Sequence, residues 1–151
     1  MGGCSPDKNP QEKGGEMSTN QQVIDNALFA GGVIEAGASA NATDSASALS
    51  DFNAMMAEWG QSSKDLNWFP QDDLTATCPI PTWAERGVIA NLAISLAPVF
   101  RYPVTNDLNR KANQGINVIT RTLINLNLDP ADMTHLPMGE GRYSSNIETG
   151  I

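Results

Sequence analysis

Apolar residues recur at helical spacing in four separate stretches of this chain. The run with the largest side chains steps by three, four and three residues through Leu49, Phe52, Met56 and Trp59. Such spacing places all four on one face of an α-helix. This helix is predicted to start near Thr43 or Asp44 and to end at Gly60. The pattern by itself is typical of a core helix.

An earlier helix is predicted to begin at Thr19 and to extend to about residue 36. Thr19 and Gln22 fit a capping box, in which the Gln22 side chain reaches back to the backbone N–H of the cap residue. The apolar stripe consists of Val23, Ile24, Ala27, Leu28 and Ile34. Gly31 and Gly32 weaken this helix, since each glycine costs ~1 kcal/mol relative to alanine. They either permit close packing of another backbone or mark a bend. Gly37 is the expected C-cap.

Two further helices are predicted in the second half of the chain. The third begins with a capping box from Thr82 to Glu85 and stops at Pro98, because proline cannot continue the helical hydrogen bonds. The fourth is capped by Thr105 or Asn106, and its regular apolar period runs through Leu108, Ala112, Ile116, Ile119, Leu123 and Leu126. Its outer face is polar and basic and consists of Asn109, Arg110, Lys111, Asn113, Asn117 and Arg121.

The segments between and beyond these stretches lack a helical period. Residues 1–17 hold glycine, proline and polar residues and no aliphatic residue beyond methionine, so they are predicted to be a disordered N-terminal extension. Residues 60–81 are predicted to be a long loop with at most a short strand, in which Trp68-Phe69 is either a lid on the core or an anchor for a neighbouring subunit. Residues 127–151 are predicted to form an extended C-terminal arm that cannot fold by itself.

Together these elements predict an all-α fold, a small four-helix bundle with a long central loop and an extended C-terminal arm. The 151 residues fit one domain, a helical core over residues 18–126. No apolar run reaches the roughly 18 residues that a membrane span needs, so no membrane partner is expected.

The net charge of −8 is unevenly distributed along the chain. Residues 1–73 carry −8, residues 74–128 carry +3 and residues 129–151 carry −3. Tight binding of DNA needs several lysines or arginines on phosphates, so a chain this acidic is a poor candidate for it. The same charge is compatible with the lining of a channel through which DNA passes without binding, or with ordinary solubility.

No constellation of residues typical of catalysis or metal binding is evident in the sequence. His135 is the only histidine and lacks the spacing of a metal ligand, while Cys4 and Cys78 fit a reducing cytoplasm. A glycan hydrolase needs two facing carboxylates, for which the available residues are Glu58, Asp65, Asp72, Asp73 and Glu85. We expect no cofactor, no metal and no catalytic residue.

Three stretches, in the same order, resemble one known family. The first runs from Leu49 to Trp59 and reads Leu-x-x-x-Asn-x-Met-x-Ala-Glu-Trp. The second ends at Pro98 and reads Asn-Leu-Ala-x-x-Leu-Ala-Pro, and the third begins at Leu136 and reads Leu-Pro-Met-Gly-Glu-Gly-Arg, where the family has Met-Pro-x-Gly-x-Gly. They are similar to stretches of the tail accessory factor of short-tailed, podovirus-type bacteriophages. The loop at residues 60–81 contains no stretch that resembles the sequence of this family.

The resemblance implies a head-to-tail adaptor that forms a ring, a dodecamer if it follows the family, between the portal protein and the next tail component. Such a protein is assembled in the host cytoplasm, lies in the neck of the virion and meets double-stranded DNA only as passing cargo. The arm residues that would bind the portal or a neighbouring copy are Leu136, Pro137, Met138, Gly139, Gly141, Arg142 and Tyr143. The residues expected to touch neighbouring subunits are Trp68, Phe69, Arg110, Lys111 and Arg121.

Two alternatives remain at this point. Members of the resembled family have been credited with cell-wall degradation, which makes a virion-associated peptidoglycan hydrolase the first. A small helical interaction protein unrelated to phages is the second.

Overall fold

The computed structural model describes residues 17–127, which contain four α-helices and no named strand. The helices are α1 (Asn20–Gly31), α2 (Ala42–Gly60), α3 (Thr82–Phe100) and α4 (Asn106–Asn127). The all-α prediction is therefore confirmed for this part of the chain. The predictions for the N-terminal extension and for the C-terminal arm lie outside the described residues.

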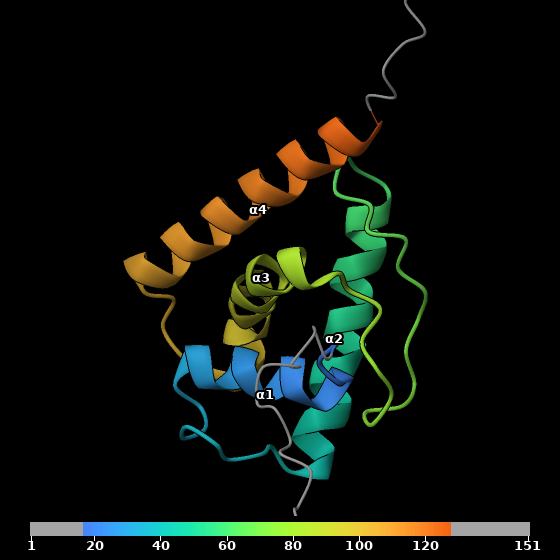
Figure 1. Cartoon of the computed structure of the whole chain (residues 1–151). Coiled ribbons are helices and arrows are strands. Elements are labelled where there is room, and N and C mark those ends of the chain that lie inside the picture. Colours follow the sequence, from blue (N-terminus) through green and yellow to red (C-terminus); the bar gives the residue numbers. More distant parts are fainter. Residues whose placement is uncertain (1–16, 128–151) are drawn as a thin grey trace, which may run out of the picture.

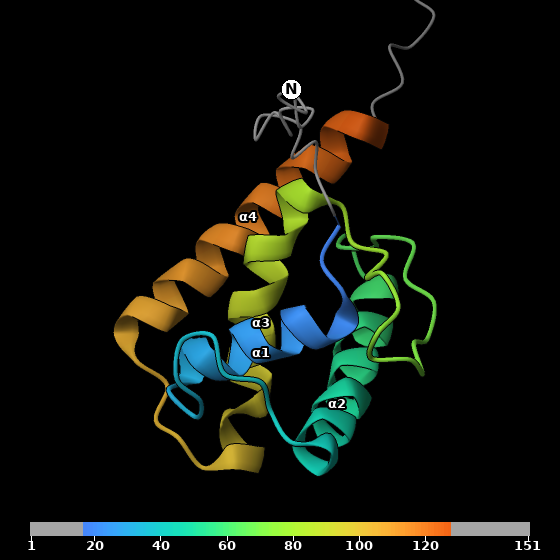
Figure 2. The ribbon, with the colours of Figure 1, turned by 60° about the horizontal axis from the view of Figure 1, so that its bottom comes forward.

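Helix α3 lies at the centre of the fold. In Figure 1 it is seen nearly end-on, with α1 below it, α2 to its right and α4 above it, and each of the three packs against it. The view in Figure 2 shows α4 running beside α3. α3 suits this place because small and apolar residues surround its axis, and those buried are Ala84, Gly87, Val88, Ala90, Leu92, Ala93, Leu96 and Ala97.

The predicted apolar face of α2 is buried in the core. Phe52 has no exposed surface, Met56 is 1% exposed and Trp59 is 7% exposed. They share one cluster with Leu92 of α3, and the prediction of a core helix is confirmed. The extensive contact of α4 is with α3 and not with this face of α2.

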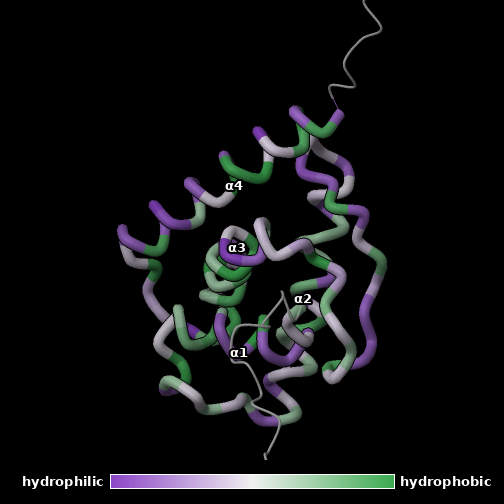
Figure 3. Tube along the Cα trace, in the orientation of Figure 1, coloured by the Kyte–Doolittle hydropathy of each residue, from purple (hydrophilic) through white to green (hydrophobic). Residues whose placement is uncertain are grey.

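The apolar stripe of α4 is covered only in part. Leu108, Ala112 and Ile119 are buried, whereas Ile116 and Leu123 are half-buried. Leu126, which the period assigns to the core, is 67% exposed. Figure 3 shows hydrophilic and hydrophobic positions alternating along this helix.

The C-terminal end of α1 differs from the sequence prediction. α1 ends at Gly31, because Gly32 takes the left-handed conformation (φ 78°) and its N–H donates to the carbonyls of Leu28 and Phe29. Ile34 therefore lies in the connection to α2, and Gly32 replaces Gly37 as the C-cap.

α3 departs from prediction at both ends. Its N-cap is Pro81, which makes no side-chain capping bond, and Glu85 instead accepts a hydrogen bond of 2.5 Å from the Ser18 hydroxyl. The predicted capping box is therefore wrong. Pro98 does not stop the helix, which continues to Phe100, because a proline in the last turn removes only one helical hydrogen bond.

The long loop after α2 is fixed to the core by side-chain amides. The Asn53 Oδ1 accepts hydrogen bonds from the Gln71 backbone N–H (2.9 Å) and from the Trp68 indole N–H (3.2 Å). The Asn53 amide nitrogen donates to the Gln71 carbonyl at 2.7 Å, and that of Asn20 donates to the Asp73 carbonyl at 2.8 Å. Since buried backbone groups need partners, these amides allow an irregular loop to cover the core.

Replacing Asn53 with alanine is expected to lower the free energy of unfolding by ~1–3 kcal/mol, because the backbone groups of Gln71 lose their partners. The measurement is urea unfolding followed by circular dichroism. Asn117→Ala is the matched control, since Asn117 is exposed on α4 and its replacement should change stability by no more than ~0.5 kcal/mol. Equal stability of the two variants would contradict the role given to Asn53.

Candidate functional site

Helices α1, α3 and α4 enclose a surface groove of about 450 Å³. The end of α1, the first half of α3 and the first half of α4 supply its walls. Its lining residues are Phe29, Ala30, Trp83, Arg86, Gly87, Ile89, Ala90, Thr105, Asp107, Leu108, Lys111, Gln114, Gly115 and Val118. We call it the α1–α3–α4 groove.

Two glycines from different helices are among the residues that line this groove. Gly87 of α3 and Gly115 of α4 meet so closely that a Cβ atom added to Gly87 would lie 2.8 Å from the Cα of Gly115. The Asn91 amide fastens the same crossing, since it donates to the carbonyls of Gly87 (2.8 Å) and of Ala112 on α4 (3.1 Å). Without side chains at the crossing, the two helices approach and leave a depression beside them.

The walls expose large apolar side chains. Phe29 is 52% exposed, Trp83 is 38% exposed and Val118 is 51% exposed. They come from three different helices and line one groove. An exposed apolar cluster with a polar rim is typical of a binding surface.

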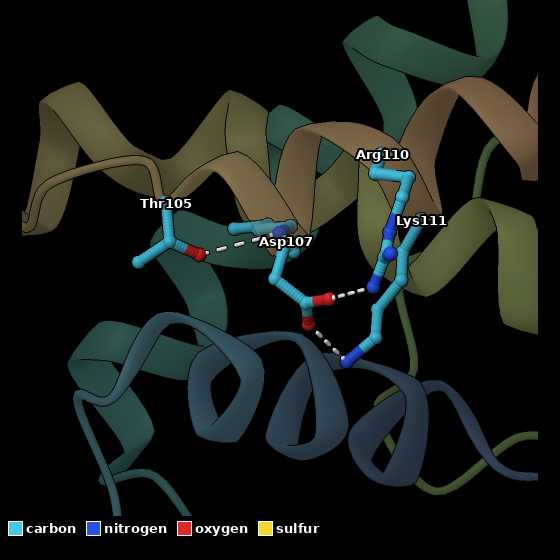
Figure 4. A network of polar contacts seen from close by, with 5 residues as sticks. Thr105, Asp107, Arg110 and Lys111 are labelled. Carbon is cyan, nitrogen blue, oxygen red and sulfur yellow. Dashed lines mark hydrogen bonds and ion pairs between the residues drawn. The ribbon is translucent and has the colours of Figure 1, made fainter.

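The rim is charged and is organised by Asp107 in the first turn of α4. Its carboxylate accepts from Arg110 at 2.5 Å and from Lys111 at 2.6 Å, and Figure 4 shows the two side chains converging on it. The hydrogen bond from Lys111, followed by that from Arg110, lowers the pKa of Asp107. Thr105 caps the helix by accepting from the Leu108 N–H at 3.2 Å, as predicted. Since all three charged groups are exposed, the ion pairs are weak and exchangeable.

The residues predicted to touch neighbouring subunits divide between the core and the surface. Trp68 is half-buried and packs on Phe52, with ring centroids 4.7 Å apart, so it covers the core. Phe69 is 59% exposed. Arg110, Lys111 and Arg121 are exposed on α4, and only Lys111 lines the groove. The predicted arm residues 136–143 lie outside the described residues.

Asp73 and Cys78 have shifted pKa values with local structural causes. Hydrogen bonds from the Thr75 hydroxyl and N–H lower the pKa of Asp73, the opposite of what a general acid needs. Burial raises the pKa of the Cys78 thiol to about 11, so it is protonated at neutral pH. His135 lies outside the described residues. Within residues 17–127, no group of three or more acidic, histidine or cysteine side chains could hold a metal ion.

Sequence reasoning missed the glycine crossing and the walls of the groove. Gly87 and Gly115 each interrupt a helical pattern, which by itself predicts only a weaker helix. Phe29 and Trp83 lie outside the apolar stripes of their helices. Aromatic residues at such positions indicate an exposed apolar surface, and this was the signal in the sequence that pointed to the groove. No signal in the sequence indicated that both lie beside α4.

No protein-family model matches this chain, and no curated protein matches it significantly. Among the described residues, none of the helices has the length and apolar character needed to cross a lipid bilayer.

Proposed function

We propose that this protein is a head-to-tail adaptor of a short-tailed bacteriophage. It binds below the portal ring, extends the DNA channel and carries the next tail component. The observation that carries the proposal is that three stretches of this chain resemble the tail accessory factor family and follow one another in the same order as in that family. They are Leu49–Trp59, Arg86–Pro98 and Leu136–Arg142. The first two supply much of the α2 and α3 core, so a shared pattern there is consistent with a shared helical scaffold.

The charge distribution supports assembly into a ring. A ring with cyclic symmetry joins one face of each copy to a different face of the next. Acidic residues predominate up to residue 73, which includes α1 and α2, whereas the exposed outer face of α4 carries Arg110, Lys111 and Arg121. An α4 face meeting the acidic part of a neighbour would bring opposite charges together, which favours one orientation of contact.

The proposal is tested by native mass measurement of the full chain, alone and with the portal ring of the phage that encodes it. Alone, at micromolar concentration, we expect a monomer or weak oligomer, since the helical core over residues 18–126 offers little area for strong self-association. With the portal, we expect a complete ring of added copies. Failure of the full chain to bind the portal, or a stable ring in free solution, would contradict the proposal.

A deletion of residues 135–151 tests where the adaptor holds the portal. We expect the helices to remain folded by circular dichroism and co-sedimentation with the portal to be lost. If the shortened chain stays folded and binds as well as the intact chain, the helices hold the portal and the arm does not.

A further inference from the structure

The lining of the α1–α3–α4 groove carries two positive side chains, Arg86 and Lys111, and one carboxylate, Asp107. Within residues 17–127, both ion pairs belong to Asp107, which leaves Arg86 on the groove wall without a carboxylate partner there. Lys111 stands on the same groove and shares its carboxylate with Arg110. A ligand that fits the groove therefore combines an acidic group for Arg86 and Lys111 with an apolar side chain for Phe29 and Trp83.

The basic character of the groove continues along α4. Lys111, Gln114, Val118 and Arg121 follow one another at steps of three and four, which places them on one face of the helix. Arg121 is exposed. A segment that lies along this face reaches a cation before it enters the groove.

One segment of this chain has the matching chemistry. Residues 136–143 carry Leu136, Met138 and Tyr143 around the carboxylate Glu140. Residues 129–151 together carry −3, four carboxylates against Arg142. The other candidate, residues 1–16, contains no aliphatic or aromatic side chain apart from Met1. Apolar content therefore favours the C-terminal segment.

The connection is long enough for the segment to reach the groove of its own chain. Along the helix, Lys111 lies sixteen residues before Asn127, or about 24 Å at ~1.5 Å per residue. Residue 136 follows Asn127 by nine residues, which span up to about 30 Å when extended. A chain that turns back after Asn127 can therefore place Glu140 beside Lys111.

We propose that residues 136–143 of the free protein bind in the α1–α3–α4 groove of the same chain. Glu140 pairs with Arg86 and Lys111, and an apolar side chain from the segment covers Trp83 and Phe29. The groove is occupied by the segment of the same chain more often than by that of a second copy, because a short tether gives the segment an effective concentration on the order of millimolar. At micromolar protein, this is roughly a hundredfold or greater advantage. The proposal is independent of the adaptor function, since its test contains no portal.

The test is carbodiimide coupling of the full chain, which joins a lysine amine to a carboxylate in contact with it. An equal mixture of ¹⁴N- and ¹⁵N-labelled protein at micromolar concentration separates products within one chain from products between chains by mass. We expect Lys111 joined to Glu140 within one chain, beside a separate product of Lys111 with Asp107, its ion-pair partner at 2.6 Å. Lys64, which lies over the Trp59 ring at the end of α2, is the internal control for random encounters and should give roughly tenfold less product with Glu140.

Two variants define the contact. Glu140→Gln should abolish the Lys111–Glu140 product and leave the Lys111–Asp107 product, which identifies the carboxylate. Arg86→Glu should reduce the Lys111–Glu140 product several-fold while circular dichroism shows intact helices. Equal yields at Lys111 and Lys64 would overturn the proposal. So would a Lys111–Glu140 product found mainly between unlike labels, since the occupant would then be a second copy.

Discussion

Replacing Phe52 with alanine is expected to lower the free energy of unfolding by ~3–5 kcal/mol. The Phe52 ring has no exposed surface and packs on Trp68, so the substitution loses the transfer free energy of the ring and leaves a cavity. The α2 helix and the loop above it both depend on this side chain. A loss of this size is a large fraction of the ~5–15 kcal/mol that stabilises a typical domain.

The measurement is thermal and urea unfolding of the purified variant. Phe69→Ala is the matched control, because the same type of side chain is 59% exposed one residue beyond Trp68. We expect that control to change stability by no more than ~0.5 kcal/mol. Near-normal melting of the Phe52 variant would show that this face of α2 does not form the core.

Replacing Gly87 with alanine is expected to destabilise the protein by ~1–3 kcal/mol, although alanine is the better helix former. The added Cβ would lie 2.8 Å from the Gly115 Cα and 3.0 Å from its carbonyl carbon. Both are backbone atoms, so no side chain can turn away and the helices must separate. Separation also strains the hydrogen bond from Asn91 to Ala112, which joins α3 to α4. Gly115→Ala should act in the same direction, since its Cβ would collide with the Gly87 backbone.

Gly60→Ala provides the control of opposite sign. Gly60 is the last residue of α2, and a Cβ there would meet no atom closer than 4.0 Å. We expect that variant to be neutral or more stable by up to ~1 kcal/mol, from helix propensity and the smaller entropy of the unfolded chain. If Gly87→Ala is also neutral or stabilising by urea unfolding, the two helices do not touch at this crossing.

The sequence by itself determined the elements whose signals are local. The all-α class and the existence of four helices followed from apolar period, because side chains three and four residues apart share a face wherever the helix packs. The Thr19–Gln22 capping box and the Thr105 cap followed for the same reason, since both bonds close within one turn. α2 begins at Ala42, one residue before the first predicted position, because Asn41 supplies the cap to Asp44.

Only the tertiary structure decided which partners those elements meet. Glu85 fits a local capping box but bonds Ser18, which lies far away in the sequence. Trp68 covers the core because Asn53 and Phe52 of α2 lie beneath it, which no pattern in the loop could indicate.

The groove is the clearest case of that division. Gly87 and Gly115 each weaken a helix when considered alone, and they become a contact only when α3 and α4 cross at that point. Phe29 and Trp83 become the walls of one groove for the same reason. Helical period is a property of neighbouring residues, whereas a binding surface depends on contacts between residues distant in sequence, and a single sequence carries little direct signal for those contacts.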